Sequence, residues 1–132
     1  MKLYRPVGLK ELQLMIASDF SGFPPRLAQQ PIFYPVLNFT YAEQIAKRWN
    51  TVDAMSGYAG FVTEFDIDDD FAKRYPVQLA GDKDVHQELW VPAEELDEFN
   101  HNIIGRIRVI AHYTGEKFTG EIDESTHLPV NQ

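Results

Sequence analysis

The hydrophobic positions in the first part of the chain recur at helical spacing in two places. Apolar residues three and four positions apart predict one amphipathic helix over residues 8–18. A second helix is predicted over residues 41–49, where Thr40 and Glu43 match a capping box ahead of an apolar face. The stretch 21–30, which holds a glycine and two prolines, predicts a loop after the first helix.

An alternation of apolar and polar positions predicts strands elsewhere. Residues 59–67 alternate most regularly. Further strands are predicted over residues 3–5, 32–34, 85–91 and 103–113. The first of these is expected to stop at Pro6, because proline cannot donate a ladder hydrogen bond. Short helices are expected at residues 70–74 and after Pro92.

The order of these elements predicts an α+β fold. Connections in the second half of the chain read as loops rather than crossover helices, which favours a mixed or antiparallel sheet with about three helices packed on it. No repeat or linker divides the chain, so one domain over residues 1–132 is expected. The polar stretch 115–132 predicts an extended or loosely packed tail.

Composition narrows the classes of function. The chain has no cysteine, which excludes a disulfide scaffold, a thiolate zinc site and a cysteine nucleophile. The formal net charge of −8 disfavours nonspecific nucleic-acid binding, although a single arginine can still hold a small anion. No segment approaches the roughly 20 apolar residues that cross a bilayer, so no membrane partner is expected and the cytoplasm is the expected compartment.

The predicted strand 85–91 concentrates residues that could carry chemistry. His86, Glu88 and Trp90 share one face of it, and a histidine with a carboxylate can serve in acid–base work or metal binding. The alternative is a solvated strand face on which His86 pairs with Glu88. The histidines have no recognisable zinc spacing, and the acidic run 66–70 lacks the glycine and closing glutamate of an EF-hand, so no metal is expected.

Two arginines are candidates for anion binding. Arg5 follows Tyr4 at the end of the first predicted strand, and Arg26 follows a Phe-Pro-Pro run in the loop. Either guanidinium could grip a phosphate or carboxylate through a bidentate fork, or form a surface salt bridge. An aromatic-rich middle could form part of the core or stack on a flat ring of a ligand. Its members are Phe33, Tyr34, Tyr41 and Trp49.

Three segments carry a resemblance to a known family. Residues 3–6, 32–34 and 86–92 resemble the ADP-ribosyltransferase superfamily, in which an early strand carries an Arg or His and a later strand carries a Glu. About half of the chain resembles a group of small bacterial proteins labelled "ADP-ribosylation/crystallin". The Ser-Thr-Ser element common in the superfamily is missing, and His86 stands two positions before Glu88, where a Glu or Gln is usual.

This resemblance implies an NAD-dependent ADP-ribosyltransferase, with catalytic roles for Glu88, Arg5 and Tyr34 in one cleft. Glu88 would stabilise the positive charge on the ribose as nicotinamide leaves. Arg5 would contact the phosphates or the ribose of NAD, and Tyr34 would lie beside the nicotinamide. The implied cofactor-binding residues are Arg5, Tyr4, Arg26, Phe33 and His86. The alternative is a non-catalytic nucleotide-binding or protein-interaction domain of the same fold, for which a homodimer is one expected state.

Overall fold

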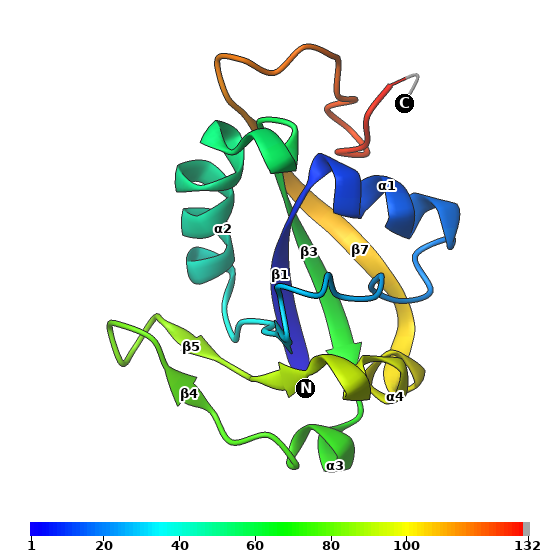
Figure 1. Cartoon of the computed structure of the whole chain (residues 1–132), viewed down its shortest axis with the longest axis vertical. Helices are drawn as coiled ribbons and strands as arrows, with labels where there is room; N and C mark the ends of the chain where they lie inside the picture. Colours follow the sequence, from blue (N-terminus) through cyan, green and yellow to red (C-terminus); the bar gives the residue numbers. More distant parts are fainter. Residues whose placement is uncertain (131–132) are drawn as a thin grey trace.

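A three-stranded antiparallel sheet lies at the centre of the structure, a computed structural model that describes residues 1–130. Its strands run in the order β1 (Lys2–Gly8), β3 (Ala59–Ile67) and β7 (Ile103–Thr114). Figure 1 shows β3 between the other two strands. This arrangement confirms the α+β class and the antiparallel pairing expected from the sequence.

A second group of short strands continues from the free edge of β1. Val36 bridges Tyr4 on one side and Glu88 on the other, both in antiparallel fashion. Beside it, β2 (Ile32–Phe33) pairs with β6 (Val91–Pro92), and β4 (Gln78–Leu79) pairs with β5 (Gln87–Glu88). Directly opposed residues point to the same face of a sheet, so Tyr4, Val36 and Glu88 share one face.

Helices cover both faces of the central sheet. The α-helices are α1 (Leu9–Ala17), α2 (Phe39–Arg48), α3 (Asp69–Ala72) and α4 (Leu96–His101). Turns of 3₁₀ helix occupy Asn50–Val52, Ala54–Ser56 and Ala93–Glu95. Residues 1–130 thus contain four α-helices where about three were expected, and the short helix expected at 70–74 is present as α3. Asp68 caps it, since its carboxylate accepts from the Phe71 N–H at 2.9 Å.

The alternating side chains of β1 divide the core into two layers. Leu3 and Val7 point toward α1 and join the larger apolar cluster, which includes Leu12 and Met15 of that helix. The opposite face packs on α2. Figure 1 shows α1 and α2 on different sides of β1, in agreement with these contacts. Because Arg5 alternates with Tyr4, its side chain points to the α1 side.

Two element boundaries differ from the predicted ones for identifiable reasons. Strand β1 continues through Pro6 to Gly8, because beyond Tyr4 its outer edge has no neighbouring strand and the missing proline N–H breaks no ladder. Helix α2 begins at Phe39 rather than residue 41. Its cap is Asn38, whose side chain accepts from the Tyr41 N–H at 2.8 Å and donates to the Val85 carbonyl at 2.6 Å.

The C-terminal segment 115–130 folds back on the domain through turns. Ile122 and Pro129 form a bridge, and Phe118 and Ile122 pack against the larger core cluster. The remainder of the predicted tail, residues 131–132, lies outside the described residues. Within residues 1–130, no helix combines the length and hydrophobicity that a membrane span requires.

Candidate functional site

A cleft of about 530 Å³ opens beside the free edge of β1. Its walls come from three parts of the chain: Arg5 to Gly8 of β1 with α1, the proline-containing loop, and the end of α2 with the following 3₁₀ turns. Exposed apolar side chains at this cleft are Leu14, Leu27, Tyr34, Trp49 and Met55. The rim therefore carries these apolar side chains together with the exposed Lys10, while Arg5 and Arg26 lie deeper.

Arg5 forms a bidentate ion pair inside this cleft. Its Nε donates to Glu11 Oε2 at 3.0 Å and its second terminal nitrogen donates to Oε1 at 3.2 Å. The Arg5 side chain is only 7% exposed, and its guanidinium carbon lies 4.7 Å from the centre of the Phe33 ring. Since α1 begins directly after β1, Glu11 in its first turn faces back onto Arg5.

Arg26 lies beside this pair with a largely buried side chain and without an equivalent partner. Its side chain is 9% exposed, its nearest carboxylate oxygen is Glu11 Oε1 at 3.9 Å, and its Nε has no hydrogen-bond partner among the described residues. Burial is the main cause that lowers the pKa of Arg26, and the neighbouring Arg5 charge lowers it further. Two guanidiniums thus share one carboxylate, which leaves a local excess of one positive charge.

Hydrogen-bond acceptors gather where the 3₁₀ turns meet β1. Asn50 Nδ2 donates to Ser56 Oγ at 2.9 Å, and Ser56 Oγ donates to Asp53 Oδ2 at 2.7 Å. All three residues line the cleft. A Cβ on Gly8 would lie 2.6 Å from the Ser56 Cα, so the turn can approach β1 this closely only because residue 8 is glycine.

Glu88, the expected catalytic carboxylate, lies outside this cleft. It is 7% exposed and accepts hydrogen bonds from Tyr41 Oη and Trp90 Nε1, each at 2.7 Å. Burial, followed by the bond to Glu88, raises the pKa of Tyr41. Register places Glu88 on the α2 face and Arg5 on the α1 face of the sheet. The expectation that Arg5, Tyr34 and Glu88 share one cleft is therefore corrected.

The other residues proposed for cofactor binding do not all lie in one place. Arg5, Arg26 and Tyr34 line the cleft, and the Tyr34 ring centre lies 5.8 Å from the Arg5 guanidinium carbon. Phe33 is fully buried beneath both arginines.

Tyr4 and His86 lie away from the cleft. Tyr4 packs edge-on against Phe39 on the α2 face. The His86 ring contacts Tyr41, and its Nε2 lies 2.8 Å from Gln44 Oε1. The alternative reading of strand 85–91, a His86–Glu88 pair, is thus not what the structure contains.

Comparisons with protein-family models, with curated proteins and with solved structures find no match to this chain. The resemblance to the ADP-ribosyltransferase superfamily stays a prediction. Function must accordingly be inferred from the residues of the cleft.

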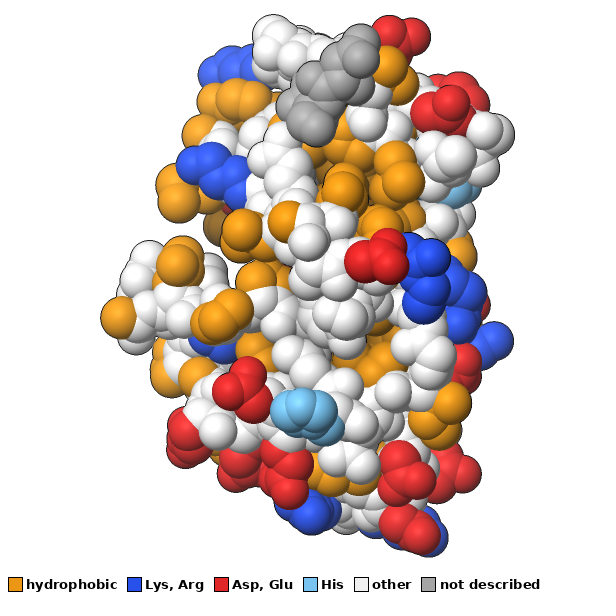
Figure 2. Space-filling model, turned by 90° about the vertical axis from the view of Figure 1, so that its right-hand side faces the viewer, with side chains coloured by type: hydrophobic (Ala, Val, Ile, Leu, Met, Phe, Trp, Pro, Cys, Tyr) orange, Lys and Arg blue, Asp and Glu red, His pale blue; other side chains and the backbone are white. Residues whose placement is uncertain are grey.

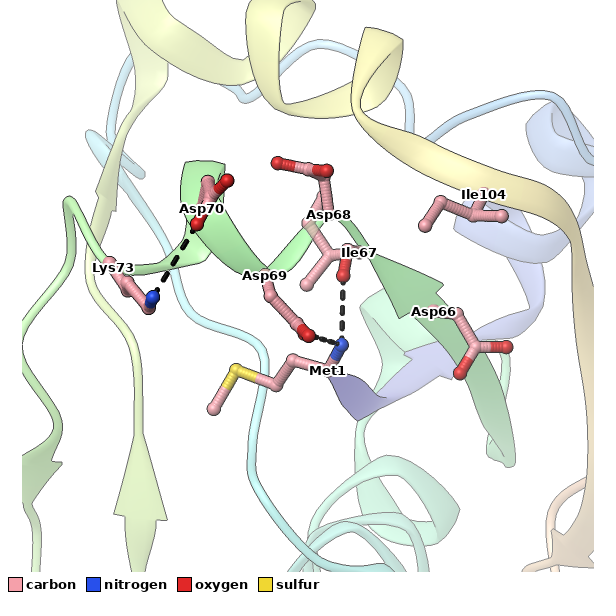
Figure 3. Close-up of a pocket in the computed structure, with 8 residues that line it drawn as sticks. All are labelled: Met1, Asp66, Ile67, Asp68, Asp69, Asp70, Lys73 and Ile104. Atoms are coloured by element: carbon pink, nitrogen blue, oxygen red, sulfur yellow. Dashed lines mark hydrogen bonds and ion pairs between the residues drawn. The ribbon is translucent and has the colours of Figure 1, made fainter.

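A second hollow, of about 630 Å³, lies among acidic residues at the start of α3 (Figure 3). The Met1 amino group donates to the Ile67 carbonyl at 2.9 Å and pairs with the Asp69 carboxylate, and this contact lowers the pKa of Asp69. Lys73 lies 3.4 Å from Asp70. No group of three or more His, Asp or Glu side chains in residues 1–130 could hold a metal ion.

Acidic side chains are also frequent on the surface near this hollow. Figure 2 shows them gathered at the lower end of the molecule, the end at which α3 and α4 lie in Figure 1. The cations of the acidic hollow are already paired, and we assign no site to it.

Sequence reasoning missed four residues of the cleft: Glu11, Asn50, Asp53 and Ser56. Glu11 could have been found from the sequence, since it is the acidic residue in the first turn of the helix that follows the strand carrying Arg5. Asn50 and Asp53 follow the predicted helix 41–49, and nothing in their spacing indicates that Ser56 closes against β1.

Proposed function

We propose that the cleft binds a small anionic ligand, a phosphate or carboxylate of nucleotide size or less, held by Arg26 with Arg5. This agrees with the alternative of a non-catalytic nucleotide-binding domain. The buried, unpartnered Nε of Arg26 carries the proposal. A buried charged donor without an acceptor is costly, and an anion beside it would recover that cost.

The charge balance of the cleft supports an anion rather than a neutral ligand. Glu11 neutralises Arg5 through both of its oxygens, so the positive charge of Arg26 is left with only a 3.9 Å contact. In a low-dielectric setting such a charge attracts an anion more strongly than an exposed arginine does. The exposed rings of Tyr34 and Trp49 offer flat surfaces for the remainder of the ligand.

The test is calorimetric titration with inorganic phosphate and adenosine monophosphate at low ionic strength. We expect binding by the native chain and a loss of at least tenfold in affinity for Arg26→Met. Arg106→Met is the matched control, because that arginine is 64% exposed in an ion pair with Asp19. Absence of binding by the native chain, or equal binding by Arg26→Met, would refute the proposal.

The same variant separates a binding role from a structural one. Removal of one buried charge is costly mainly when it leaves its partner uncompensated, and Glu11 keeps both of its hydrogen bonds to Arg5 when Arg26 is replaced. Arg26→Met should therefore unfold at the same or a higher temperature while it loses the ligand. A large loss of stability would mean that Arg26 serves the fold instead.

Cleavage of NAD with Glu88 at the reaction centre remains a separate prediction. Both Glu88 oxygens already accept hydrogen bonds on the α2 face, so the anion site proposed here gives Glu88 no contact with the ligand. Release of nicotinamide from NAD by the purified chain, compared with Glu88→Gln, tests that activity directly.

A further inference from the structure

The cleft has two chemically different ends. Arg5 and Arg26 supply donors at one end, since a guanidinium has no acceptor, and both oxygens of the Glu11 carboxylate beside them already accept from Arg5. Asn50, Ser56 and Asp53 form a hydrogen-bonded group at the other. Ser56 packs on Gly8, three residues along β1 from Arg5, which corresponds to about 10 Å of strand.

The second end has unused acceptor capacity. Asn50 is 7% exposed, and its Oδ1 has no hydrogen-bond partner among residues 1–130. The hydrogen bonds of the group run in one direction, from the Asn50 amide through Ser56 Oγ to the Asp53 carboxylate. Asp53 is half-buried at the cleft wall, and a carboxylate can accept about four hydrogen bonds.

From this polarity we infer that the ligand carries hydroxyl or amine donors at the end opposite its anionic group, and that Asp53 with Asn50 binds these donors. This inference rests on the proposed anion site and adds the chemistry of the remainder of the ligand. A ligand with a bare hydrocarbon or phenyl end would leave the acceptors at Asp53 and Asn50 unsatisfied. Asp53 and Asn50 therefore select ligands that carry such donors, while the two arginines attract the anionic group of the ligand.

The test compares two phosphate esters of similar charge. Adenosine monophosphate carries hydroxyl and amine donors, whereas phenyl phosphate has a flat ring and none. We expect adenosine monophosphate to bind the native chain roughly tenfold more tightly, as one or two hydrogen bonds to a charged acceptor provide. Asp53→Asn should remove most of this advantage and leave the affinity for phenyl phosphate unchanged or slightly higher. Asp19→Asn, at an 86% exposed residue, is the matched control.

Each outcome decides between the two proposals. Equal binding of the two esters, or an advantage that survives in Asp53→Asn, overturns the inference and leaves the anion site standing. If neither ester nor inorganic phosphate binds, the anion site itself falls. Should Asp53→Asn fail to fold, amide chemical shifts of the native chain give the answer: adenosine monophosphate should move residues 50, 53 and 56, and phenyl phosphate should not.

Discussion

Glu11 acts as an internal anion in the proposed site, and Glu11→Gln tests this role. The substitution keeps the size of the side chain but removes the charge that Arg5 and Arg26 share. Removing one partner of a fully buried ion pair costs about 3–5 kcal/mol, whereas exposed pairs are worth below about 1 kcal/mol. Arg5 is 7% and Glu11 20% exposed, and glutamine still accepts one hydrogen bond, so we expect a loss of about 2–3 kcal/mol.

An added anion should replace the missing charge. A ligand present at one hundred times its dissociation constant stabilises the native state by about 2.7 kcal/mol, close to the loss expected for the variant. Urea unfolding of Glu11→Gln should therefore approach native stability as phosphate rises, with sodium chloride holding ionic strength constant. The native chain should gain less, because its Glu11 competes with phosphate for both arginines.

The control is Glu98→Gln, which removes an equivalent charge from an exposed pair with Arg74. It should change stability by less than about 1 kcal/mol and show no recovery in phosphate. Two results would refute the reasoning: a Glu11→Gln variant as stable as the native chain without phosphate, or an equal gain from phosphate in both proteins.

Two further predictions concern the α2 face. Burial, followed by the hydrogen bond to Glu43, raises the pKa of Tyr113 to about 12, so the native state retains a proton that the unfolded chain releases near pH 10. The stability that this group contributes is complete below about pH 10 and is lost as pH rises through 12. In urea unfolding, Tyr113→Phe should lose less stability than the native chain over this pH range. An equal loss in both proteins would contradict the prediction. Glu88→Gln should leave phosphate affinity within about twofold, because Glu88 does not line the cleft, yet lower stability by about 1–2 kcal/mol, because an amide cannot accept from both Tyr41 and Trp90. A large loss of affinity by calorimetry would place Glu88 at the ligand after all.

The fold was predictable where burial pattern and local chemistry agree. Strand β3 has the predicted bounds 59–67, because its residues at every second position are fully buried against the α1 side. The predicted strand 85–91 instead divides into β5 and β6, with Leu89 and Trp90 between them. Val36 pairs with Glu88, and β2 pairs with β6. No local sequence pattern indicates these pairings.

The candidate site was only partly predictable for a related reason. Arg5 and Arg26 could be singled out as anion binders, but their closeness depends on how the loop folds over Phe33. The face on which Glu88 lies depends on register, and a shift by one residue would reverse it. Residue types therefore indicate which chemistry is available, while strand pairing decides which side chains meet.

The order of strands in the central sheet also constrains how the chain can fold during synthesis. Among residues 1–130, strand β1 pairs with β3 and, at Tyr4, with Val36 alone, and β3 completes its pairing with β7, beyond residue 100. Such distant pairings make folding slow and leave apolar strands unprotected until late in translation. A ribosome-bound chain that stops before β7 should thus remain sensitive to proteases, and the cleft beside β1 should form only once most of the domain has emerged.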